Sequence, residues 1–162
     1  MTAATDYPRS IYEAKMDAYY YARLHVLHER LYSRLDKLGK LIELVSGSGA
    51  FYAVCMAYET LTQTFALIVA FIALASLVFD PAGRARVMRD GVRNYMEVVA
   101  MCSDEAVSLS AVDKRLAEIG VDAPTVIDGL RRPAYNQNLA SHGRDGYMVA
   151  LSRYERVLQA IA

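Results

Sequence analysis

Residues 65–79 read FALIVAFIALASLVF, and Asp80, Pro81 and Gly83 follow at once. The stretch is apolar on every side of a helix, so it has no polar face to present to water. With the preceding TLTQT it makes twenty uncharged residues between Glu59 and Asp80. A helix of this length extends about 30 Å, the thickness of the hydrocarbon layer of a bilayer. The stretch predicts a transmembrane helix, and the alternative is a fully buried core helix.

A second, weaker apolar segment precedes it. Residues 44–58 read LVSGSGAFYAVCMAY and carry no charge. With Leu41 and Ile42 the segment reaches about seventeen residues, at the low end for a crossing. We expect it to insert as the hairpin partner of residues 65–79. Small residues recur along both segments and let two helices approach closely in lipid, so the packing candidates are Gly49, Ala53, Ala57, Ala66, Ala70 and Ala73.

The basic residues lie on the two outer sides of this hairpin. Arg30, Arg34, Lys37 and Lys40 precede it, whereas the connection from Glu59 to Thr64 has neither Lys nor Arg. By the positive-inside rule we expect both termini to be cytoplasmic and the chain to cross the membrane more than once; a bacterial inner membrane is the expected location, in line with the family resemblance given below. The arginines after the second segment are expected to anchor the chain to anionic lipid; they are Arg84, Arg86, Arg89 and Arg93.

The flanking regions predict helices. Residues 10–40 contain no proline and no glycine before Gly39. Apolar residues follow steps of three and four through this region, which is an almost heptad seam; it comprises Leu24, Leu27, Leu31, Leu35, Leu38, Ile42 and Val45. The tyrosines beside it (12, 19, 20, 21 and 32) are expected to pack against the C-terminal region. There, Ser110 is predicted to cap a short helix ending at Gly120, and residues 146–162 form a last amphipathic helix.

The fold class is therefore predicted to be all-α. Residues 1–40 are a cytoplasmic N-terminal arm, residues 41–80 a transmembrane helical hairpin, and residues 81–162 a cytoplasmic region with short C-terminal helices. A soluble helical bundle is the competing fold, but a chain of 162 residues would struggle to bury two consecutive apolar helices on every face.

Composition and motifs point away from catalysis and nucleic acid. The formal net charge is zero, which gives no basic field for nucleic acid. His25 and His28 are expected to share a helix face, and Glu29 follows four residues after His25. The order is not HExxH and no third strong ligand is marked, so we expect a pair of surface or interface histidines, no metal and no cofactor. Cys102 has no basic partner that would activate a nucleophile. The protein is not expected to be an enzyme.

Polar residues near the hairpin suggest a possible path for ions. Glu43 lies at the start of the first segment, where a carboxylate either reaches the interface or faces a polar interior. One such carboxylate per subunit would form an acidic ring in an oligomer, and the alternative is a solvated helix-boundary carboxylate. The pore-lining candidates are Glu43, Ser46, Ser48, Thr60, Thr62 and Gln63.

The layout resembles the SLATT family of small two-span membrane proteins. The stretches that carry the resemblance are YYYARLHVLHERLYSRLDKLGK (19–40), FALIVAFIALASLVFDPAGRARVMRD (65–90) and DAPTVIDGLRRPAYNQNLASHG (122–143). The resemblance implies an oligomeric inner-membrane effector that breaches the membrane in a prokaryotic conflict system. The alternative function is a structural or adaptor subunit of a membrane complex, or a phage-associated membrane protein, that docks a protein partner through its arms.

Overall fold

The computed structural model describes residues 9–46, 48 and 59–162, without the side chains of residues 59–62. All regular structure in these residues is helical, which confirms the predicted all-α class. The elements are α1 (Ile11–Ser46), α3 (Glu59–Phe79), α4 (Pro81–Met101), α5 (Leu109–Val121), the 3₁₀ turn η1 (Asp128–Leu130), α6 (Arg131–Ser141), the 3₁₀ turn η2 (Asp145–Tyr147) and α7 (Arg153–Ile161).

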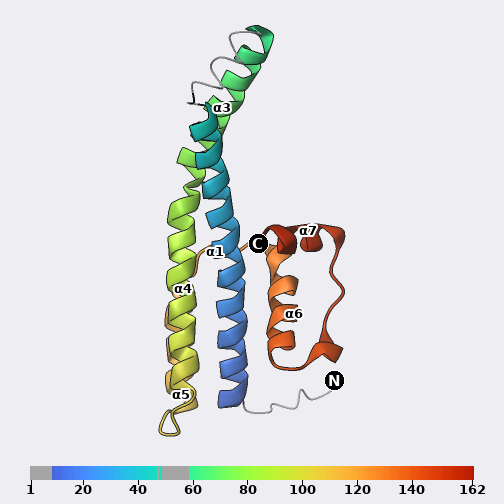
Figure 1. The fold of residues 1–162 in the computed structure, drawn as a ribbon. Helices are drawn as coiled ribbons and strands as arrows, with labels where there is room; N and C mark the ends of the chain where they lie inside the picture. Colours follow the sequence, from blue (N-terminus) through green and yellow to red (C-terminus); the bar gives the residue numbers. More distant parts are fainter. Residues whose placement is uncertain (1–8, 47, 49–58) are drawn as a thin grey trace, which may run out of the picture.

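The long helix α1 forms the axis of the molecule, as Figure 1 shows. Its first turn is closed by Ser10 and Glu13: the Glu13 carboxylate accepts from the Ser10 backbone N–H at 2.7 Å, and the Ser10 hydroxyl accepts from the Glu13 N–H at 3.2 Å. This reciprocal arrangement satisfies two donors that a helix start leaves unpaired. The predicted helix over residues 10–40 is confirmed, and it continues without a break to Ser46.

Two cores flank the lower half of α1. On one side, three alanines spaced four residues apart (Ala14, Ala18 and Ala22) leave room for Tyr95 and Val98 of α4. Small residues at this spacing allow the close approach of α4, because they lie on one helix face. The ring of Tyr21 stacks on that of Tyr95 at 5.2 Å between centroids. Helix α5 packs against the same core through Val112 and Ile119.

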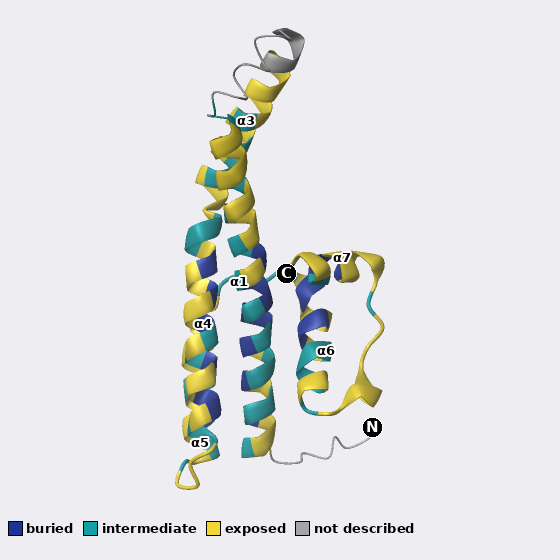
Figure 2. Ribbon diagram, in the orientation of Figure 1, coloured by how far each residue is buried: buried dark blue, intermediate teal, exposed yellow. Residues whose placement is uncertain are grey.

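On the other side, the leucine seam of α1 packs against the C-terminal helices. Leu24, Leu27 and Leu31 are buried with Leu130 of η1, Ala134 of α6 and Leu158 of α7. Each fully buried leucine stabilises the fold by about 1.5–3 kcal/mol. Helices α6 and α7 therefore lie across α1 from α4, and the dark blue residues of Figure 2 gather on this lower part of the molecule.

The two histidines of α1 face opposite sides of the bundle, and both are buried. The His25 Nδ1 lies 2.9 Å from the Tyr21 carbonyl. Its ring occupies the space beside Gly91, where an added Cβ would come within 2.4 Å of the His25 Cδ2. A glycine at position 91 is thus needed for α4 to approach α1.

His28 joins α1 to the segment that precedes α6. Its Nδ1 lies 2.8 Å from the Leu24 carbonyl, to which it donates. Its Nε2 accepts from the Ile127 backbone N–H at 2.7 Å, across the interface. This pairing fixes the neutral tautomer, because a protonated Nε2 could not accept a hydrogen bond. Both histidines thus lie at helix interfaces, but the prediction that they share a helix face is wrong, because His25 packs beside Gly91 and His28 pairs with Ile127. The described residues contain no group of three His, Cys, Asp or Glu side chains that could hold a metal ion.

Burial lowers the pKa of both histidines below the ordinary value of 6.5. The folded protein therefore resists protonation that the unfolded chain accepts. Stability is fully present above pH 6.5 and falls as the pH drops through that value towards the lower folded-state pKa. The loss amounts to at most about 1.4 kcal/mol per pH unit for each histidine.

We predict that the free energy of unfolding in detergent decreases between pH 7.5 and pH 5.5, and that the decrease is smaller in His28→Gln. Glutamine does not titrate in this range, so the variant loses the proton linkage of His28 whatever its absolute stability. Chemical unfolding followed by circular dichroism over this pH range measures both slopes. Equal slopes in the two proteins would contradict this role of His28.

Candidate membrane-inserting segment

The helix α3 has almost no protein around it. None of residues 63–79 is buried, and Leu67, Phe71 and Leu77 are 73%, 73% and 78% exposed. The helix that begins at Gln63 and continues through α4 is long and apolar enough to cross a membrane, and among the described residues it is the only such helix. Its apolar window is 0% buried, whereas the core helix of a soluble protein is mostly buried.

A free-energy comparison shows what this exposure means. Eight large apolar side chains of α3 are exposed, from Phe65 to Phe79. Leaving them in water forgoes at least about 12 kcal/mol of burial. That amount is as large as the whole stability of a typical domain, about 5–15 kcal/mol. Such a helix is best explained by an apolar environment that is supplied from outside this chain and covers its exposed side chains.

The upper end of α1 is arranged in the opposite way to its lower end. The exposed side chains there are largely apolar, and they are Leu35, Leu38, Leu41, Ile42, Leu44 and Val45. The half-buried positions are Asp36, Gly39 and Ser46, which lie on one face at helical spacing. Lys37, Lys40 and Glu43 are exposed as well, so the outward side is mostly but not wholly apolar. Apolar residues outside and polar residues towards the partner helix are the distribution expected of helices in lipid.

The register between α1 and α3 follows from two contacts. An added Cβ on Gly39 would lie 3.3 Å from the Ser76 hydroxyl, and Arg89 pairs with Glu29 at 2.7 Å. Helix α1 is therefore antiparallel to α3 and α4, as Figure 1 shows. Lys40 pairs with Asp36 at 2.7 Å near the base of α3, so these two charges offset each other where α1 leaves the bundle.

A capped turn separates α3 from α4. Asp80 has a left-handed backbone (φ 39°), and its carboxylate accepts from the Gly83 N–H at 3.0 Å. Pro81 occupies the first helical position, where its missing N–H costs nothing. Arg84 donates through Nε to the carbonyl of Phe79 at 2.7 Å, which satisfies an acceptor at the end of α3. The sequence signal Asp-Pro-x-Gly thus marks the border of the apolar helix.

The four predicted lipid-anchoring arginines are all exposed but lie at different heights. Arg84 and Arg86 are about 6 and 9 Å from Asp80 along the helix axis, whereas Arg89 and Arg93 are about 14 and 20 Å away. Arg89 also pairs with Glu29, and Arg93 with Glu97 at 3.6 Å. The first two therefore lie close to the end of α3, and the other two lie within the bundle region.

Four of the pore-lining candidates have side chains within the described residues. The side chains of Glu43 and Gln63 are exposed. Ser46 donates to the Ile42 carbonyl at 2.7 Å and Ser48 to the Val45 carbonyl at 2.8 Å. These bonds within the helix let serine hydroxyls enter an apolar environment. The side chains of Thr60 and Thr62 lie outside the described residues.

The small residues of α3 form a face of their own. Ala66, Ala70 and Ala73 are exposed, whereas the half-buried positions of this helix are Val69, Ile72, Ala75 and Ser76. The contact with α1 therefore uses the second set, and the small face is left for other neighbours. The matching candidates of the first segment (Gly49, Ala53 and Ala57) lie outside the described residues.

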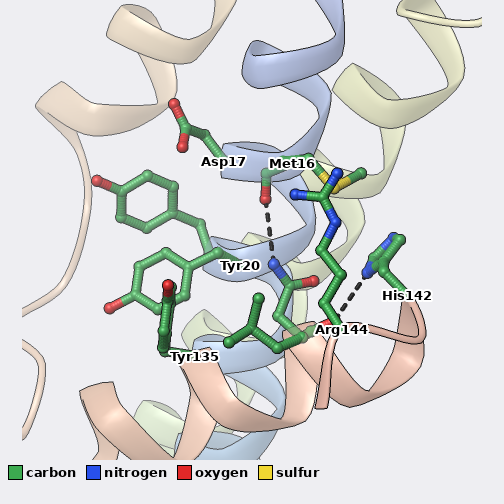
Figure 3. A pocket seen from close by; sticks show the side chains of 9 residues that line it. Met16, Asp17, Tyr20, Tyr135, His142 and Arg144 are labelled. Atoms are coloured by element: carbon green, nitrogen blue, oxygen red, sulfur yellow. Dashed lines mark hydrogen bonds between the residues drawn. The ribbon is translucent and has the colours of Figure 1, made fainter. Parts of the chain in front are cut away.

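A cavity opens on the opposite end of the molecule, between α1 and α6 (Figure 3). It has a volume of about 420 Å³ and is lined by Met16, Asp17, Tyr20, Tyr21, Tyr135, Asn138, Leu139, His142 and Arg144. The Asn138 amide donates to the Met16 carbonyl at 3.4 Å across its floor. The tyrosines of α1 thus pack near the C-terminal region as expected, and part of their surface remains open. Sequence reasoning did not single out Tyr135 or Arg144, because only the fold brings them to α1.

No family model, curated protein or solved structure matches the chain. The resemblance to SLATT proteins stays an expectation from the sequence.

We predict that Gly83→Ala destabilises the turn between α3 and α4 by about 1 kcal/mol, the usual value of a helix cap. A Cβ at position 83 would lie 2.1 Å from the Asp80 carboxylate, which must turn away and lose its bond to the backbone. Thermal unfolding in detergent gives the difference. In an Asp80→Gly background the same change should cost less, because the clashing carboxylate is gone. Equal costs in both backgrounds would contradict this account of the turn.

Proposed function

We propose that this chain is a small inner-membrane protein whose apolar hairpin crosses the bilayer, self-associates there and perturbs the membrane. The observation that carries the proposal is α3, an apolar helix with 0% of its window buried, beside the upper end of α1, where six large apolar side chains are exposed. The helical bundle made by α4 to α7 and the lower half of α1 would remain in the cytoplasm.

The charges near the base of the hairpin support this topology. Arg34, Lys37 and Lys40 of α1 and Arg84 and Arg86 of α4 lie near the two points at which the helices would enter the bilayer. Positive residues beside a span favour the cytoplasmic side. The first described residue, Arg9, and the last helix, α7, lie on the bundle side of these charges. We therefore propose that both termini are cytoplasmic and that the hairpin predicted for residues 41–80 crosses the bilayer twice.

Self-association is supported by the alanine face of α3. In lipid, helices associate through close packing of small residues rather than through the hydrophobic effect. Ala66, Ala70 and Ala73 stay exposed after α1 has packed against its own face of α3. A second copy of the hairpin would find this face open. An oligomer would also bring several copies of Glu43 together, which favours a cation path.

A second function is favoured by the cavity between α1 and α6. Tyr20, Tyr21 and Tyr135 line it together with one acidic and one basic side chain, Asp17 and Arg144. Aromatic rings with nearby charges are common at protein interfaces. In this case the hairpin is an anchor, and the bundle docks a partner protein as an adaptor.

We predict that the protein stays in the membrane pellet after an alkaline carbonate wash, and that Phe71→Arg releases a large part of it. An arginine at the centre of a span costs about 3 kcal/mol of insertion free energy. Tyr147→Arg, at a 74% exposed position of the bundle, is the control and should leave the protein in the pellet. Wild-type protein that washes off would refute the membrane assignment.

We predict that Ala70→Leu weakens self-association about tenfold, the equivalent of ~1.4 kcal/mol, and reduces dye leakage from liposomes in parallel. Leucine at this position blocks close approach on the small face. Phe71→Leu places the same side chain at the adjacent position and should change neither property. Crosslinking in vesicles and a dye-release assay give the two values.

Unchanged association in Ala70→Leu would contradict the role of the small face. Inserted wild-type protein that leaves liposomes intact would count against membrane perturbation. A stoichiometric protein partner that is lost in Tyr135→Ala but kept in Tyr147→Ala would then establish the adaptor function instead.

A further inference from the structure

The C-terminal helix α7 has an apolar side that stays largely exposed, although the ring of Tyr154 on this side lies against Gly129 of η1. Its buried residues are Glu155, Leu158 and the following Ala162. Tyr154, Val157 and Ile161 repeat at helical spacing and are exposed, Val157 at 60%. Two exposed arginines, Arg153 and Arg156, flank this apolar set. A short helix with apolar and basic residues on its free side is suited to the boundary between lipid headgroups and acyl chains.

The position of α7 along the molecule agrees with such a boundary. The guanidinium of Arg34 on α1 donates to the Ala160 carbonyl of α7 at 3.2 Å. The register set by Glu29 with Arg89 and by Gly39 with Ser76 places Arg34 opposite the turn at Pro81–Gly83. The helix α7 is therefore at the height at which α3 ends. In Figure 1 it lies across the axis of α1 rather than along it.

The leucine seam of α1 changes its surroundings at the same height. Below α7, the seam residues Leu24, Leu27 and Leu31 are buried against the C-terminal helices. Above it, Leu35 and Leu38 continue the seam and are exposed. The protein cover of this face of α1 thus ends at α7, and the exposed apolar surface that begins there is continuous with α3.

The charges at this height are complementary to an anionic surface. Arg34, Arg84, Arg86, Arg153 and Arg156 lie around the turn between α3 and α4 and on α7. Glu155 is turned inward, where the capping box with Ser152 and the ion pair with Arg132 at 3.7 Å occupy its carboxylate. The hydrogen bond from the Ser152 backbone also lowers the pKa of Glu155.

From these placements we propose that α7 lies in the headgroup layer of the bilayer as a second, in-plane membrane contact, with Val157 and its apolar neighbours towards the acyl chains and Arg153 and Arg156 on anionic headgroups. This inference rests on the proposed membrane crossing by α3. It implies that the bundle contacts the membrane at two places, the hairpin and α7, and that its orientation relative to the bilayer is therefore fixed.

The chain contains no tryptophan, so a single introduced tryptophan reports its own surroundings without background. The full-length protein carrying Val157→Trp is reconstituted into phosphatidylglycerol-containing vesicles whose lipids carry bromine either near the headgroup or near the chain ends. Phe71→Trp in α3 tests the crossing itself. Tyr147→Trp in η2 is the water-exposed control. Arg144, just before η2, donates to the Tyr12 hydroxyl at 3.0 Å. Tyr12 lies about 33 Å below Arg34 along α1, so η2 is far from the proposed headgroup layer.

We expect the Val157→Trp emission to shift to shorter wavelength and to be quenched by the bromines near the headgroup, whereas Tyr147→Trp is unaffected. Changing both Arg153 and Arg156 to Gln in the Val157→Trp protein should lower the ratio of lipid-contacting to released α7 about thirtyfold. Each arginine near an anionic surface raises this ratio about 5.4-fold, and the two factors multiply. Circular dichroism of the reconstituted proteins checks that the helices are retained.

Val157→Trp emission that matches that of Tyr147→Trp, while Phe71→Trp is quenched, would overturn the proposal and leave the crossing intact. Quenching of Val157→Trp that is the same with and without the two arginines would overturn the electrostatic part of it. If Phe71→Trp is not quenched either, the crossing by α3 fails, and the in-plane contact of α7 fails with it.

Discussion

The structure depends on one mismatch of length: the long helix α1 extends to Ser46, but the buried cores of the bundle involve it only up to Leu31. Over its lower half α1 is packed on two sides, by the alanine face against α4 and by the leucine seam against η1, α6 and α7. Burial of these apolar residues supplies the main favourable free energy of the bundle. Above Leu31 the same seam continues with Leu35 and Leu38 exposed. The hydrophobic effect therefore still acts on this end of α1, but the chain itself does not satisfy it.

Polar groups mark the height at which the two environments meet. The left-handed Asp80 caps α4 and, with Pro81, ends the hydrogen-bonding pattern of α3. Arg84 satisfies the carbonyl at the end of α3, and Arg34 that of Ala160 in α7. Each of these bonds closes a helix end that would otherwise leave an unpaired acceptor. Helix caps therefore mark the boundary between the exposed apolar helix and the bundle. The two arginines that contribute to these caps also make this boundary positively charged.

Within the bundle, the two histidines show how few polar groups the interior admits and how each is paired. His25 fills the space beside Gly91, and His28 accepts a hydrogen bond from Ile127. Both are held neutral by burial, which lowers their pKa. In the part of the chain that the structure describes, no three His, Cys, Asp or Glu side chains form a group that could hold a metal ion. The role of the two histidines in the structure is to join α1 to α4 and to the C-terminal helices.

Several features followed from the sequence by itself. The uncharged run ending at Asp80 indicated one helix suited to lipid, because no helix face in it is polar. The absence of proline and of early glycine predicted the long helix that became α1. The seam of α1 was correctly located, but periodicity cannot say where its burial stops. Ser108 rather than Ser110 caps α5, and the last helix begins only after Ser152, since a cap depends on backbone geometry that residue type does not fix.

Only the tertiary structure decided which faces meet and at what height. It placed Val69 and Ile72 rather than Ala66, Ala70 and Ala73 towards α1, brought Tyr135 to the tyrosines of α1, and set α7 level with Arg84. These contacts join residues far apart in the chain, and their register depends on the packing of whole helices. A sequence pattern gives the character of each helix face; only packing decides what that face touches.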